Sequence, residues 1–85
     1  MKNYFVEIRS KLKKEINFED LEIVDNSYKH IKHKSYSTGK LYLHLKFKSS
    51  YLDSMSRLNA QKKIMTILKD DLRNKIHALE ISIEQ

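Results

Sequence analysis

One eight-residue stretch constrains this chain more than any other, because large apolar side chains occupy every second position of it. The stretch reads LYLHLKFK from position 41 to 48. Successive side chains of a β-strand point to opposite faces of a sheet, so the pattern predicts a strand with one buried face. His44 falls on the other face and is expected to be an ordinary surface residue. The predicted inward set is Leu41, Leu43, Leu45 and Phe47, and the predicted outward set is Tyr42, His44, Lys46 and Lys48.

Two other segments have strand character. Residues 21–25 read LEIVD and predict a short first strand, and residues 75–83 read KIHALEISI and predict the last one. Regular alternation in the last strand places His77 with the apolar side chains, so we expect this histidine to share the buried face. Residues 26–40 are polar, contain the only glycine and predict a long hairpin loop. The apolar residues that share a face with the histidine are Leu79, Ile81 and Ile83.

Two segments show the spacing of an amphipathic helix. Over residues 3–15, apolar side chains recur every three or four positions, with basic residues elsewhere on the helical wheel. Residues 56–73 carry a longer apolar stripe and predict a second helix, preceded by a short turn at 51–54. The hydroxyl of Ser54 or Ser56 would cap this helix by accepting one of its free backbone N–H groups.

The predicted order is helix, strand, strand, helix, strand, with one apolar face on each strand. Two helices on one side of a three-stranded sheet would bury all of these faces, which predicts a single α+β domain over residues 1–85. The first two strands would form an antiparallel hairpin, and the long helix would make a right-handed parallel crossover to the third, so the sheet would be mixed. With 85 residues and no cysteine, such a domain depends on packing for its stability.

The net charge of +6 is unevenly placed along the chain. Between Asn26 and Leu52 there are six lysines, three histidines and no acid. Such a basic block suits nucleic acid, an acidic lipid or an acidic protein surface, but a coding bias toward lysine would produce it as well. No apolar run is long enough to span a membrane, so we expect a cytoplasmic protein without a membrane partner.

The sequence lacks the usual constellations of an enzyme. Asp70 and Asp71 are adjacent on the predicted helix, where their side chains point about 100° apart and cannot act as a paired acid and base. A single glycine, Gly39, excludes a glycine-rich phosphate loop. There is no cysteine nucleophile and no serine in a recognisable catalytic turn. We therefore expect a binding protein that is not an enzyme.

Several of these segments, taken together, resemble the BolA family. They are LEIVDNSYKHIKH, the alternating strand that follows, and ILKDDLRNKIHALEI. The most specific pieces are the D-x-S-x-K-H-x-x-H loop after the first strand and the H-A-L that opens the last strand. The resemblance implies a fold similar to a class II KH domain. It also implies two roles, namely partnership with a monothiol glutaredoxin in iron–sulfur cluster handling, and DNA-binding transcriptional regulation.

The resemblance also implies a set of metal ligands. His77 in H-A-L and His30 in the loop would bind iron in a [2Fe–2S] cluster, with His33 as the reserve loop ligand. A glutaredoxin and its glutathione would supply the two sulfur ligands, and the two imidazoles would make the cluster Rieske-like. The isolated protein would hold no cofactor and would be a monomer or a weak homodimer. The residues alone leave a plainer interpretation open, in which the strand histidine is partly buried and the loop histidines are solvated.

The chain departs from the family where the long helix begins. The R-H-R segment that the family commonly carries there is replaced by Ala60, Gln61 and Lys62. That surface is proposed to contact DNA in the family, so we expect any binding to be weak, sequence-independent and steeply salt-dependent. The alternatives to a glutaredoxin partner are thus a DNA-binding regulator and a diverged domain with neither activity. The remaining candidates for nucleic-acid contacts are Lys62, Lys63, Lys69, Arg73 and Lys75.

Overall fold

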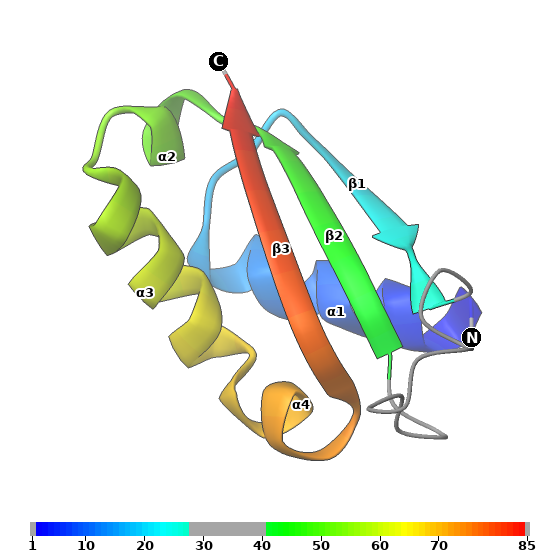
Figure 1. Ribbon diagram of the computed structural model, residues 1–85. Helices are drawn as coiled ribbons and strands as arrows, with labels where there is room; N and C mark the ends of the chain where they lie inside the picture. The colour runs from blue at the N-terminus through cyan, green and yellow to red at the C-terminus, as the bar shows by residue number, and fades with distance from the viewer. Residues whose placement is uncertain (1, 28–40, 85) are drawn as a thin grey trace.

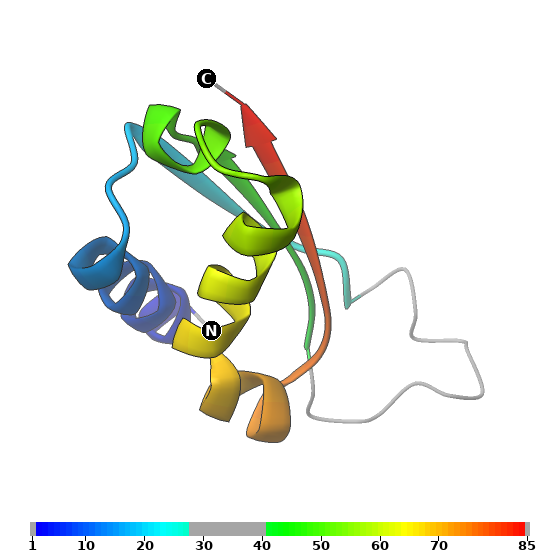
Figure 2. The same ribbon diagram turned by 90° about the vertical axis from the view of Figure 1, so that its left-hand side faces the viewer.

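Three strands form one sheet, and the helices lie on one side of it (Figures 1 and 2). The computed structural model describes residues 2–27 and 41–84, so the predicted loop lies outside the described residues from position 28 to 40. None of the described helices is long and apolar enough to cross a lipid bilayer. In chain order, the elements are α1 (Lys2–Glu15), β1 (Asp20–Asp25), β2 (Leu41–Lys48), α2 (Ser50–Asp53), α3 (Arg57–Ile67), α4 (Lys69–Asn74) and β3 (Ile76–Glu84).

The strand order confirms the predicted mixed sheet. β2 is the central strand, and it pairs antiparallel with β1 and parallel with β3. In the antiparallel pair, Leu21 lies opposite Phe47 and Ile23 lies opposite Leu45, so apolar side chains of both strands share one face. The hairpin and the parallel crossover expected from the sequence are therefore both present.

The core lies between this face and the helices. All four residues predicted to point inward from β2 are buried, and Ile8 and Leu12 of α1 are buried against them. The rings of Phe18 and Phe47 meet edge to face, with their centroids 5.8 Å apart. Ile81 of β3 is buried as well. Removal of this apolar surface from water is the main stabilising contribution in a domain without disulfides.

The helix predicted over residues 56–73 is in fact two helices, α3 and α4. The chain leaves α-helical geometry at Leu68, where φ is −98° and ψ is 19°, and it resumes a helix one residue later. Leu68 is fully buried, so the break keeps this side chain in the core while α4 takes a new direction. Ser56 caps α3, because its hydroxyl accepts the N–H of Asn59 at 3.1 Å. The expected turn before it is the short helix α2.

Candidate functional site

A β-bulge at the start of β3 decides where His77 lies. Leu41 pairs with Ile76 and Tyr42 pairs with Ala78, so His77 is an extra residue that has no direct partner on β2. The apolar side chains beyond the bulge keep to the helix side, as does the one immediately before it. The expectation that His77 shares their face is therefore wrong, because regular alternation does not continue across an inserted residue.

The imidazole of His77 lies on the open side of the sheet. It is exposed, and its ring centroid lies 4.8 Å from that of Tyr42, with the planes tilted by 47°. Tyr42 points outward as predicted but is buried. Within residues 2–27 and 41–84, no hydrogen bond or ion pair engages the ring nitrogens of His77. The ring is thus supported on one side and accessible to a ligand from outside the domain.

Tyr42 connects this histidine to the end of β1. The N–H of Asn26 donates to the carbonyl of Tyr42 at 2.7 Å, and the N–H of Tyr42 donates to the hydroxyl of Ser27 at 3.1 Å. Asn26 and Ser27, the last described residues before position 28, therefore lie beside the residue whose ring contacts His77. His30 and His33 themselves lie outside the described residues.

The described residues offer one candidate metal ligand, the exposed imidazole of His77. In the parts of the chain that the structure describes, no three His, Cys, Asp or Glu side chains are grouped to hold a metal ion. A closed site usually needs four ligands from the protein. The exposed imidazole of His77 fits the role of a single ligand in a site that the loop and a partner would complete.

His44 differs from the expectation of an ordinary surface residue. It lies on the outward face of β2, as predicted, but its side chain is only 15% exposed. Its Nε2 lies 2.6 Å from the hydroxyl of Ser82, and its Nδ1 lies 3.9 Å from a carboxylate oxygen of Glu80. Both partners come from β3, so His44 is held within the sheet by the neighbouring strand.

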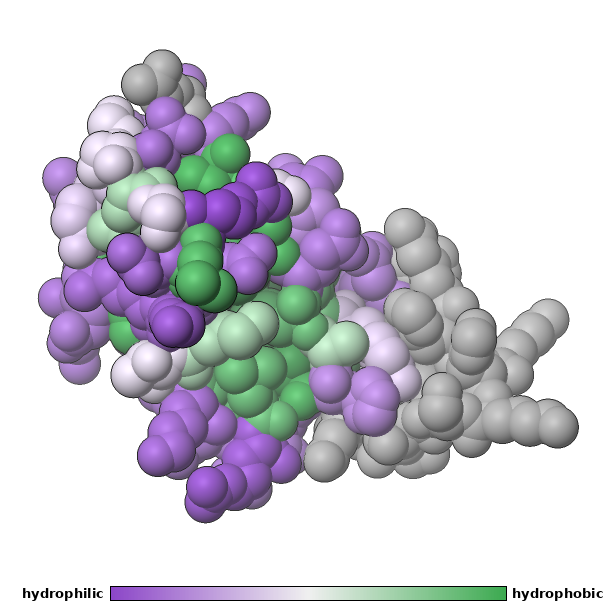
Figure 3. Space-filling model, turned by 60° about the vertical axis from the view of Figure 1, so that its left-hand side comes forward, coloured by the Kyte–Doolittle hydropathy of each residue, from purple (hydrophilic) through white to green (hydrophobic). Residues whose placement is uncertain are grey.

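Two of the candidate nucleic-acid contacts, Lys62 of α3 and Lys69 of α4, border the same hollow. This shallow hollow also includes Leu58 and Met65, whose side chains are 60% and 40% exposed. Figure 3 shows this side of the molecule, where hydrophobic surface lies among hydrophilic side chains. Ala60, which stands in the place of the first R-H-R residue, is fully buried and contributes nothing to this surface.

Two of the other three cations, Lys63 and Lys75, lie against the rings of other helices. The ammonium of Lys63 lies 5.9 Å from the ring centroid of Tyr51 in α2, and that of Lys75 lies 4.7 Å from the ring centroid of Tyr4 in α1. Arg73 is exposed on α4. Lys63 and Lys75 thus lie against two different helices, α2 and α1, and weak nucleic-acid binding stays a prediction.

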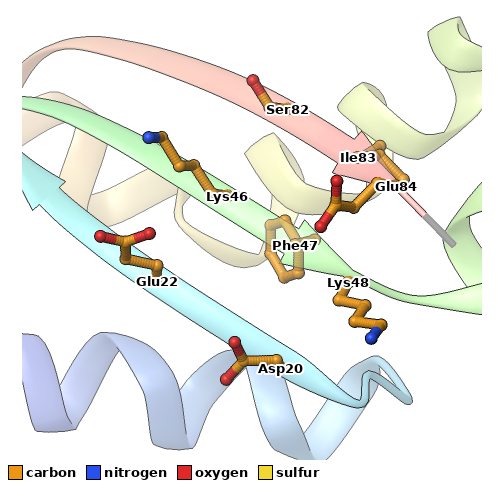
Figure 4. Close-up of a pocket in the computed structure, with 8 residues that line it drawn as sticks. All are labelled: Asp20, Glu22, Lys46, Phe47, Lys48, Ser82, Ile83 and Glu84. Carbon is orange, nitrogen blue, oxygen red and sulfur yellow. The ribbon is translucent and has the colours of Figure 1, made fainter.

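The open face of the sheet carries a second hollow, of about 220 Å³. Figure 4 shows Lys46 and Lys48 of β2 between acidic side chains of the two outer strands. Small-molecule sites are usually larger, from about 300 to 1,000 Å³, and mostly apolar. We therefore interpret this hollow as part of a solvated face on which neighbouring strands carry opposite charges. The acids around it are Asp20, Glu22 and Glu84.

A polar cluster that the sequence did not predict lies between α1 and α4. The carboxylate of Asp71 is only 7% exposed, and it accepts hydrogen bonds from the hydroxyl of Tyr4 and the ammonium of Lys11, both at 2.7 Å. Tyr4 and Lys11 are seven positions apart, so they lie on one face of α1. That spacing was the available signal, but nothing local to Asp71 shows that its partners lie in another helix.

The protonation states of the cluster follow from these contacts. Burial acts to raise the pKa of the Asp71 carboxyl, but the hydrogen bonds from Lys11 and Tyr4 outweigh it and lower the pKa overall. Burial and the bond to Asp71 raise the pKa of Tyr4, and the same carboxylate raises the pKa of Lys11. The cluster is therefore a carboxylate held by a neutral phenol and an ammonium.

Comparison with known families matches residues 12–85 to BolA, described as BolA-like protein. This chain belongs to the BolA-like family. This chain is 32% identical over 79 residues to SufE-like protein 1, chloroplastic/mitochondrial, of Arabidopsis thaliana. The match covers 87% of this chain and 21% of the relative, so the BolA-like chain spans about a fifth of that protein's length.

Solved structures confirm the BolA fold. The BolA domain of SufE1 from Arabidopsis thaliana has a TM-score of 0.76 and 30% identity to the BolA-like chain, covering 93% of this chain and 87% of that one. BolA1 from the same plant has the same TM-score and coverage at 25% identity. The solution structure of BolA1 from Mus musculus has a TM-score of 0.72 at 25% identity, covering 93% of this chain and 62% of that one.

Proposed function

We propose that this BolA-like chain partners a monothiol glutaredoxin and shares a [2Fe–2S] cluster with it through histidine ligands. The observation that carries the proposal is the exposed imidazole of His77, which a bulge presents beside the start of the histidine-containing loop. The similarity to the BolA domain of a SufE-like protein supports a role in iron–sulfur cluster assembly or trafficking. In this proposal the chain is a cytoplasmic binding protein without catalytic activity.

The chemistry of the chain suits a cluster with mixed ligands. The chain has no cysteine, so the sulfur ligands would come from the glutaredoxin and from its glutathione. When bound, such a cluster supplies one-electron redox chemistry, at a potential that imidazole ligands raise above that of an all-thiolate cluster. The contribution of this chain is to hold a neutral imidazole at a fixed place, with the ring of Tyr42 supporting one side of His77.

Chain length allows the loop histidines to reach the same site. Ser27 is bonded to the backbone of Tyr42, and His30 follows three residues later. An extended chain spans at most about 3.3 to 3.6 Å per residue, so three residues of chain reach at most about 11 Å from this attachment point. We propose His30 as the loop ligand, with His33 as its substitute.

Reconstitution with a monothiol glutaredoxin tests the proposal. The two proteins are mixed anaerobically with glutathione, iron and sulfide, and visible absorption and circular dichroism are recorded. We expect a spectrum that neither protein gives alone, and we expect His77→Ala to remove it while the domain stays folded. His44→Ala is the matched control, because that histidine faces the same side but is held by Ser82 and Glu80. An unchanged spectrum from His77→Ala would exclude His77 as a ligand.

The loop variants separate the two remaining candidates. His30→Ala alone should weaken the mixed spectrum if His33 replaces it, whereas the double variant should match His77→Ala. Mild acid should weaken the cluster that the wild-type chain forms, because imidazole binds iron only when it is deprotonated. A wild-type spectrum from the double variant would exclude both His30 and His33 as ligands.

A further inference from the structure

We propose that the cluster of Tyr4, Lys11 and Asp71 is a clamp that positions His77. It holds α4 against α1, and α4 leads directly into the bulge from which His77 projects. That the clamp positions His77 follows from contacts within this chain alone. The consequence for binding a [2Fe–2S] cluster rests on the function proposed above.

The first step is that the clamp defines where α4 lies. Both oxygens of the buried Asp71 carboxylate accept hydrogen bonds from α1, each at 2.7 Å. A buried carboxylate that loses a partner is strongly disfavoured, so displacement of α4 from α1 is costly. The ammonium of Lys75, at the end of α4, also lies 4.7 Å from the ring centroid of Tyr4. This cation–π contact fastens the other end of the same helix.

The second step connects α4 to the bulge. The N–H of Lys75 donates to the carbonyl of Asp71 at 2.8 Å, and the carbonyl of Lys75 accepts the N–H of Leu41 at 2.9 Å. Lys75 is therefore bonded on one side to the clamp residue and on the other to the first residue of β2. His77 follows Lys75 after a single residue, Ile76, which is buried.

The orientation of the His77 side chain depends on the residues on either side of the bulge. As the extra residue of a bulge, it has no cross-strand partner of its own. Its backbone is held before the bulge by Lys75 and Ile76, and after it by the pairing of Ala78 with Tyr42. If the clamp opens, the first of these two supports loosens and the imidazole is free to leave the ring of Tyr42.

The clamp is a property of this chain's own helix. Tyr4 and Lys11 precede residues 12–85, the part that matches the family, whereas Asp71 lies within it. The clamp is thus defined by the contacts of α1 with α4 in this chain.

Nuclear magnetic resonance of the isolated domain tests whether the clamp positions His77. The variants are Asp71→Asn and Tyr4→Phe, and the matched control is Asp70→Asn, which makes the same charge change at an exposed neighbour. The readouts are the nuclear Overhauser contacts between the rings of His77 and Tyr42, and amide hydrogen exchange at the start and in the middle of β2. Asp71→Asn leaves one of the two donors without a carboxylate oxygen, and Tyr4→Phe removes a single hydroxyl.

We expect both clamp variants to lose the ring contacts of His77 and the control to keep them. The amide of Leu41, which donates to Lys75, should lose at least about tenfold more protection than the amide of Leu45 in the middle of the strand. Equal loss of protection at the two amides, or ring contacts that persist in both variants, would overturn the proposal. Tyr4, Lys11 and Asp71 would then serve only to stabilise the fold. If Asp71→Asn does not fold, Tyr4→Phe decides, because it removes one hydrogen bond and leaves the carboxylate paired with Lys11.

A second arm separates this inference from the proposed function. With glutaredoxin present, the clamp variants should give a weaker mixed-cluster spectrum than the Asp70→Asn control. If the wild-type protein forms no mixed cluster but the ring contacts still depend on the clamp, the proposed function fails and the clamp stands. If the cluster forms equally well in all variants although the contacts are lost, the positioning of His77 has no role in binding.

Discussion

His44 and His77 lie on the same open face of the same pair of strands, yet their surroundings differ. His44 belongs to the regular part of the β2–β3 ladder, where Ser82 and Glu80 approach its two ring nitrogens. His77 belongs to the bulge, where Tyr42 lies beside its ring and no hydrogen bond engages its nitrogens within the described parts of the chain. In a regular ladder each residue has a residue directly opposite it on the next strand, whereas an inserted residue has no such paired residue.

Deletion of His77 should have the largest effect of the changes considered for these two regions. The pairs Leu41–Ile76 and Tyr42–Ala78 would then be consecutive in an unbulged ladder, so the domain should still fold. We expect complete loss of the mixed-cluster circular dichroism with glutaredoxin, together with an unchanged far-ultraviolet spectrum. A mixed-cluster signal of wild-type strength would show that the bulge is irrelevant to binding.

In the regular part of the ladder, the expected effect is on stability. Leu43 is buried opposite Leu79, and Leu43→Ala should lower the free energy of unfolding by about 2 to 5 kcal/mol. His77→Ala should change it by less than about 0.5 kcal/mol, since the side chain is exposed. Urea denaturation measures both, with Leu58→Ala at an exposed position as control. If His77→Ala lowered the free energy of unfolding more than Leu43→Ala, the bulge and not the regular ladder would be the region that stabilises the fold.

The clamp adds an acid dependence that the regular ladder lacks. Burial acts to raise the pKa of Asp71, but Lys11 and Tyr4 lower it overall below its ordinary value of 3.8. The folded-state pKa is thus below that of the unfolded chain. The stabilisation that the Asp71 carboxylate gives the folded domain is therefore complete above about pH 4. It is lost as the pH falls through the folded-state pKa.

Urea denaturation between pH 6 and pH 2 tests this dependence. Asp71→Asn should be less stable than wild type by about 1 to 3 kcal/mol at pH 6, and the difference should shrink toward pH 2. Asp70→Asn should show no such convergence. A constant difference at all pH values would mean that the charge of Asp71 contributes nothing to folding.

The smallest expected effect comes from the support of His44. Ser82→Ala removes the hydroxyl that lies 2.6 Å from Nε2 of this ring, at an expected cost of about 0.5 to 1.5 kcal/mol in unfolding free energy. The mixed-cluster spectrum should stay the same, because His44 is not among the proposed ligands. A loss of that spectrum at unchanged stability would assign a binding role to the regular ladder as well.

The fold was predictable because its signals are local. Alternation along β2 identified the buried face, and the order of helices and strands was sufficient for the mixed sheet and its parallel crossover. The break at Leu68 was not predictable, because the apolar stripe continues through it. Asp71 was likewise missed as a clamp residue, since its partners in α1 lie 60 and 67 positions away in the sequence.

The bulge shows where pattern analysis fails. The spacing of His77, Leu79 and Ile81 satisfies a regular strand, so the histidine was assigned to the buried face. Ile76 was the overlooked signal, because it is apolar and three positions before Leu79, a spacing that one continuous alternation cannot bury. An apolar residue on the wrong parity at the start of a strand is thus an indication of an inserted residue.

The charges on the open face of the sheet bear on how this domain avoids associating with itself. The outer strands carry carboxylates there, at Asp20 and Glu22 of β1 and at Glu80 and Glu84 of β3, while the lysines lie on the central strand. A second copy that extended the sheet sideways would bring acidic edge against acidic edge, whichever strands met. Natural sheets use charged edge strands to prevent fibril-like growth, and the arrangement here would oppose such growth at both ends of the sheet.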